Sequence, residues 1–212
     1  TGGCNTGVGS STLENNTGDN NTAVGRRALY LNTSGASNVA VGYLSLDANT
    51  TGATNVAVGR GSLGANTTAS NNVAVGDLAL VANTTGANNV AIGRDSLATN
   101  TTASGNTGVG ESALQLTTTG CCNTAVGNGA LQANTTGDDN VAVGQAALAF
   151  ATTADGNTAV GRFSMFCNTT ASGNISVGAY SLFNNTEGFS NVAIGACQPS
   201  GYGAALELNT TG

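Results

Sequence analysis

The chain has 212 residues, of which 32 are Gly and only 4% are aromatic, and it contains neither Trp nor His. This composition excludes a conventional core of large side chains, so stability has to come from repetition. The net charge of −6 with only five basic residues leaves no cationic surface for phosphates, and no apolar run of about 18 residues is present, so we expect neither a nucleic-acid partner nor membrane insertion.

The first predicted strand lies in the five-residue segment 5–9. This segment recurs along the whole chain as Asn, a β-branched residue, a small residue, Val or Ile, and Gly. The copies begin 17 residues apart, except that the first interval is 16 residues. A fixed period of this kind indicates a repeat architecture, and a unit this short cannot bury its own apolar face without its neighbours. We therefore predict an all-β fold, a parallel β-solenoid or β-roll of about twelve 17-residue coils, as a single tandem-repeat domain over 1–212.

We number the first residue of each segment position 0. It is Asn in every coil, and we expect these side chains to form a structural column that passes amide hydrogen bonds from coil to coil. The column consists of Asn5, Asn21, Asn38, Asn55, Asn72, Asn89, Asn106, Asn123, Asn140, Asn157, Asn174 and Asn191.

Later positions of the coil indicate its core. Position 3 is Val or Ile and position 8 is almost always Leu, so we expect both to point into the coil. Side chains alternate along a strand, so the small residue at position 2, mostly Ala, is predicted to form an outer column that a second chain can approach closely.

An Asn-Thr-Thr stretch follows at positions 11 to 13. Its regular polar columns are compatible with an ice-binding face, with position 12 on one side and positions 11 and 13 on the other. The same stretch contains Asn-x-Thr/Ser sequons, which indicate glycan acceptors on an extracellular rod. The acceptors of this register are Asn32, Asn49, Asn66, Asn83, Asn100, Asn134, Asn168 and Asn209.

The last coil carries an irregular insertion at 198–204, and the chain begins and ends within a repeat. Open β edges template further coils, so we expect head-to-tail self-association into a filament. The five Cys do not share columns in adjacent coils, which argues against stacked disulfides within the chain. Cys4 and Cys197 lie near the two ends, where they could cross-link neighbouring copies.

The run Asn55-Val56-Ala57-Val58-Gly59, followed by a small residue and Leu and then by Asn-Thr-Thr-Gly, resembles the head repeats of trimeric autotransporter adhesins. It is also similar to the repeat arrays that precede the self-cleaving chaperone domain in phage tail fibres and related surface proteins. The resemblance covers essentially the whole chain. It implies a parallel β-roll, a location outside the cell or at the cell or virion surface, and a trimer as the alternative to the filament.

Catalysis needs converging activated groups, but the chain has no His or Lys and its acids recur at no fixed position. We therefore expect no enzyme, no metal site and no cofactor. The predicted function is a structural extracellular fibre or filament segment, with adhesion as a further role. The alternative is an ice-binding or glycan-binding solenoid module.

Overall fold

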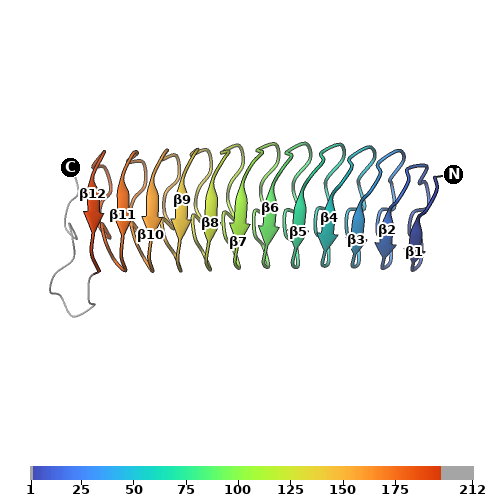
Figure 1. Cartoon of the computed structure of the whole chain (residues 1–212), viewed down its shortest axis with the longest axis horizontal. Coiled ribbons are helices and arrows are strands. Elements are labelled where there is room, and N and C mark those ends of the chain that lie inside the picture. The colour runs from blue at the N-terminus through green and yellow to red at the C-terminus, as the bar shows by residue number, and fades with distance from the viewer. Residues whose placement is uncertain (1, 197–212) are drawn as a thin grey trace. The chain divides into compact units, whose positions relative to one another are not determined.

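The computed structural model describes residues 2–196 and is an all-β protein with twelve short parallel strands, so the predicted β-solenoid is confirmed (Figure 1). The described residues fall into two compact units that divide between Gly105 and Asn106. In a solenoid each coil contacts only its neighbours, so each unit is stabilised by contacts between successive coils and not by one shared core. The predicted insertion at 198–204 lies outside the described residues.

Each strand has three residues and occupies positions 1 to 3 of its coil. The strands of the first unit are β1 (Thr6–Val8), β2 (Thr22–Val24), β3 (Val39–Val41), β4 (Val56–Val58), β5 (Val73–Val75) and β6 (Val90–Ile92). Those of the second unit are β7 (Thr107–Val109), β8 (Thr124–Val126), β9 (Val141–Val143), β10 (Thr158–Val160), β11 (Ile175–Val177) and β12 (Val192–Ile194).

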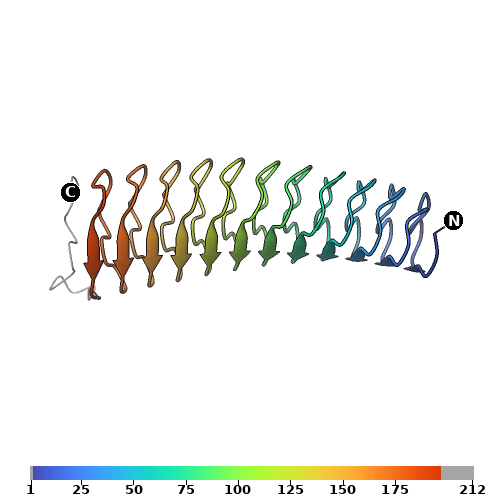
Figure 2. The same cartoon turned by 45° about the horizontal axis from the view of Figure 1, so that its top comes forward.

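Neighbouring strands within each unit pair in a strict register. Ala40 of β3 lies opposite Ala57 of β4, and Ala142 of β9 lies opposite Ala159 of β10. Figure 2 shows the strand of each coil at one side and a wide loop opposite it. Every position of the repeat therefore forms a column along the stack of its unit.

The interior of the coil is narrow, and it contains the small residues of the strand. The Leu column at position 8 is fully buried from Leu29 to Leu148 and continues with Met165 and Leu182, which confirms the inward prediction for Leu. Ala at position 2 is also buried, whereas Val and Ile at positions 1 and 3 face outward and are half-buried or exposed.

The predictions for Val and Ala on the strand are therefore wrong. Alternation puts positions 1 and 3 together on one side, and the side that faces the Leu column carries only the small side chains of position 2, which are Ala, Gly or Ser. Ala and Leu fill the interior, and the β-branched side chains form the outer surface of each unit.

The Gly at position 4 ends each strand for a steric reason. Gly59 has a φ of 137°, and a Cβ there would lie 2.3 Å from the carbonyl oxygen of Gly76 in the next coil. Only Gly combines this backbone with so close an approach, and the same geometry recurs coil after coil.

The buried Leu column has an unusual backbone. Leu63 has a φ of 50° and Leu97 a φ of 52°, in the left-handed region that costs a side chain about 1–2 kcal/mol. Burial of a Leu side chain contributes about 1.5–3 kcal/mol, which offsets that strain. The left-handed turn is what directs the Leu side chain back toward the strand.

Candidate functional site

Two columns of Asn side chains lie inside the coils and form hydrogen bonds both within a coil and between successive coils. In the first, at position 0, the backbone N–H of Asn55 donates to Oδ1 of Asn38 at 2.9 Å, and Nδ2 of Asn55 donates to the carbonyl oxygen of Ala69 at 2.9 Å. In the second, at position 11, Nδ2 of Asn49 donates to Oδ1 of Asn32 at 2.7 Å and to the carbonyl of Gly52. The structure thus places the predicted Asn column inside the coils, where it links each coil to the next.

Burial of the second column bears on the expected glycosylation. All seven acceptor Asn residues from Asn32 to Asn168 are fully buried, and the Nδ2 atom that would carry the sugar donates a hydrogen bond to the carbonyl oxygen at position 14. A glycan on these atoms is incompatible with the folded coil, because it would remove that bond and needs space the interior lacks. Asn209 lies outside the described residues.

The hydrogen bonds also bear on the expected ice face at positions 11 to 13, because they engage two of its three columns. Position 11 faces the interior, and the hydroxyls at position 12 are engaged, since Oγ1 of Thr50 donates to the carbonyl of Thr67 at 3.0 Å and Oγ1 of Thr33 to that of Thr50 at 2.9 Å. The groups at positions 11 and 12 therefore stabilise the stack, whereas the side chains at position 13, such as Thr51 and Thr85, remain exposed as a polar column.

The most distinctive surface of each unit is the outer side of its strands, which we call the β-branched face. Its two columns, at positions 1 and 3, contain only Val, Ile and Thr from Thr6 to Ile194, without one charged residue. Exposure is 36% for Val24, 37% for Val143 and 73% for Ile194. The face is a surface of methyl groups repeated at the strand spacing of about 4.8 Å. Sequence reasoning found the residues but assigned them to the interior.

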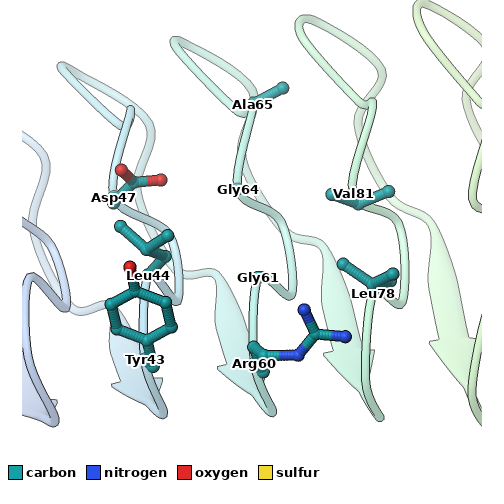
Figure 3. Close-up of a pocket in the computed structure, with 9 residues that line it drawn as sticks. All are labelled: Tyr43, Leu44, Asp47, Arg60, Gly61, Gly64, Ala65, Leu78 and Val81. Carbon is teal, nitrogen blue, oxygen red and sulfur yellow. The ribbon is translucent and has the colours of Figure 1, made fainter.

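A hollow of about 340 Å³ lies in the first unit where one coil has Gly at two outward positions (Figure 3). Gly61 and Gly64 form its floor, between Leu44 of the preceding coil and Leu78 and Val81 of the following coil. The full lining is Tyr43, Leu44, Asp47, Arg60, Gly61, Gly64, Ala65, Leu78 and Val81.

Both charged groups of the hollow have partners within the chain. Arg60 forms a bidentate pair with Asp77 at 2.8 Å, and Asp47 lies 3.4 Å from Arg27. Burial raises the pKa of Asp47, and the nearby Arg27 partly opposes that rise. The hollow is therefore an apolar notch left by two missing side chains, and its charges are already balanced.

Four of the cysteines lie in the described part of the chain, and all four are free thiols. Cys4 is exposed, as an interchain cross-link requires, and Cys197 lies outside that part. The Sγ atoms of Cys121 and Cys122 are 3.3 Å apart. The hydrogen bond with Cys122, together with desolvation and the charge of Asp138, raises the pKa of Cys121 to about 11.

Across residues 2–196, no cluster of three or more Cys, Asp or Glu is arranged to hold a metal ion, and none of that span forms a helix long and apolar enough to cross a membrane. Comparison with protein-family models, with curated proteins and with solved structures gives no match. The features that bear on function are therefore the geometry of the coil and its β-branched face.

Proposed function

We propose that this chain is a structural segment of an extracellular or surface fibre, in which copies associate laterally through the β-branched face. The observation that carries the proposal is that neither side of any strand carries a charge, with Ala, Gly or Ser on the inner side and Val, Ile or Thr on the outer side. Parallel strands of this composition are typically buried on both faces.

Large uncharged patches on a soluble protein usually mark an interaction site. The β-branched face is regular, because its strands pair in register, and its side chains have few rotamers, so little conformational entropy is lost when they are covered. A second copy offers a surface with the same spacing. The resemblance to the repeats of trimeric adhesins and tail fibres supports the same interpretation.

The test is the mass of the protein in solution as a function of concentration, by sedimentation under reducing conditions. We expect an oligomer that a Val58→Lys substitution in the middle of the first unit dissociates, because a charge would then be buried at the contact. Thr51→Lys adds the same charge at an exposed position off this face and should leave the oligomer intact. A wild-type monomer at all concentrations would refute lateral association.

Head-to-tail stacking is a second route to a fibre, supported by the parallel register in which each coil pairs with an identical one. It predicts long fibres in electron micrographs, and these should persist in Val58→Lys, because the contact is made by the ends of the stack and not by the face.

Ice binding is a candidate of a different class, and the β-branched face is a second surface for it beside the exposed column at position 13. The observation that favours it is a rigid array of Val and Thr with repeats of about 4.8 Å along the stack and about 7 Å along the strand. These spacings lie near lattice repeats of hexagonal ice. Ice binding needs a bare face, so a monomer with thermal hysteresis would favour it over lateral association.

A further inference from the structure

The β-branched face is bordered by charges of opposite sign at the two ends of its strands. Position 5, directly after the Gly that ends the strand, holds four of the five Arg: Arg26, Arg60, Arg94 and Arg162. The bend before the strand, at positions 15 and 16, has no basic residue in any coil and holds Asp19, Asp138, Asp139 and Asp155.

Two of these Arg residues already pair with carboxylates of their own chain. Arg60 pairs with Asp77 at 2.8 Å and Arg94 with Asp95 at 3.0 Å. Position 5 also holds the acids Asp77 and Glu111, so it is not uniformly basic. Arg60 and Arg94 do not require a partner from another chain.

Among the described residues, the other two Arg residues at position 5, Arg26 and Arg162, contact aromatic rings instead of carboxylates. Arg26 is exposed and lies over the ring of Tyr43 at 5.7 Å, and Arg162 is exposed and lies over the ring of Phe163 at 4.7 Å. Within residues 2–196, neither guanidinium makes an ion pair with a carboxylate. These two strand ends therefore carry positive charges that the described part of the chain does not neutralise.

Each of these Arg residues shares its strand with an exposed Asp at the opposite end. Asp19 precedes β2 and Arg26 follows it, and in the second unit Asp155 precedes β10 and Arg162 follows it.

Within residues 2–196, both Asp residues accept a hydrogen bond but form no ion pair. Oδ1 of Asp19 accepts from the backbone N–H of Gly3, and Oδ1 of Asp155 accepts from the backbone N–H of Asp138. The acid and the base cannot meet within one chain, because the three-residue strand and its Gly separate them.

We propose that copies of this chain pack parallel and in register through the β-branched face, with Asp19 opposite Arg26 of the neighbouring copy, and Asp155 opposite Arg162 of that copy. This inference rests on the proposed lateral association and specifies its orientation. Rotation about the direction in which coils stack brings the acidic end of a strand to the basic end of the same strand in the next copy. An antiparallel arrangement would bring basic ends together.

The physical role of the pairs is to select orientation and register. Ion pairs at the rim of an interface contribute modestly to affinity, whereas like charges placed opposite each other are strongly unfavourable. The β-branched face alone is compatible with many registers, since sliding by one coil superimposes equivalent methyl groups. Because only some coils carry these charges, a shift by one coil would separate the opposite charges, so the pairs favour a single register.

The experiment measures the association constant by sedimentation in low salt with reductant, for Asp155→Arg, for Arg162→Asp and for the double variant. Each single variant puts like charges opposite each other, and we expect it to associate at least about tenfold more weakly than the wild type. The double variant reverses the pair and should recover wild-type association.

Arg94→Asp is the matched control. It makes the same charge change at position 5 on β6, whose opposite end has no acid, so it should have little effect on association. Circular dichroism checks that each variant is folded. Single variants that associate like the wild type, or a double variant that does not recover, would overturn the pairing while lateral association stands. A wild-type monomer would overturn both.

Discussion

Asn134 and Ala151 hold the same position in successive coils, and the buried Oδ1 of Asn134 has no hydrogen-bond partner in the described part of the chain. Where the next described coil also has Asn at this position, its amide supplies the donor, as Nδ2 of Asn49 does for Asn32. Ala151 has no such group. An interrupted column thus leaves a buried acceptor with its desolvation cost uncompensated.

Ala151→Asn is therefore expected to stabilise the protein. Its Nδ2 would reach Oδ1 of Asn134 and the carbonyl of Ala154, as Nδ2 of Asn49 reaches Oδ1 of Asn32 and the carbonyl of Gly52. A gain of about 1 kcal/mol in the free energy of unfolding is expected, measured by denaturant titration. Ala151→Leu adds a side chain of similar size without a donor and should destabilise. An Asn variant no more stable than the wild type would contradict the role given to this column.

The orientation of the strand is tested by a pair of substitutions in β4. Ala57 is fully buried, so Ala57→Val forces two methyl groups into the narrow interior and should cost about 1–3 kcal/mol. Val58 faces outward and is half-buried, so Val58→Ala in the monomer should cost less, under about 1 kcal/mol, because its methyl groups are already partly in water. Thermal or denaturant unfolding at concentrations below association gives both values. The reverse order of costs would restore the inward assignment of Val58.

The period of the sequence was sufficient to predict the solenoid, because identical residues 17 apart can only be used equivalently if the coils stack in register. It also placed the Asn column, since an amide can donate and accept along a stack. What alternation cannot tell is which side of a strand faces inward. Val56 and Val58 share one side and Ala57 takes the other, and the width of the coil decides between them.

That width depends on a backbone feature with no sequence signal. Leu63 adopts a left-handed φ that single-residue preferences assign to Gly or Asn, and this brings the Leu column close behind the strand. The burial of the sequons has a similar origin. Asn49 and Thr50 look like a surface motif in sequence, and only the closing of the coil turns the Asn inward.

The Leu column is tested by comparing Leu97 with Leu116. Leu97 is fully buried, whereas Leu116 is 45% exposed. Leu97→Ala should lower the free energy of unfolding by about 2–5 kcal/mol through lost burial and an internal cavity. The same change at Leu116 should cost less than half as much, because its side chain is partly in water already. Equal losses at the two sites would show that burial in the column is not what stabilises the coil.

The paired thiols predict a pH dependence of chemical labelling. The thiolate is the reactive form, so a pKa of about 11 keeps Cys121 mostly protonated and slow to alkylate at pH 8. We expect its rate with iodoacetamide, followed by peptide mass spectrometry, to keep rising up to about pH 11. In Cys122→Ala the hydrogen bond that contributes most to the shift is gone, so the midpoint for Cys121 should move to lower pH. Exposed Cys4 is the internal control, and its profile should be the same in both proteins. An unchanged midpoint in Cys122→Ala would show that the neighbouring thiol is not the cause of the raised pKa.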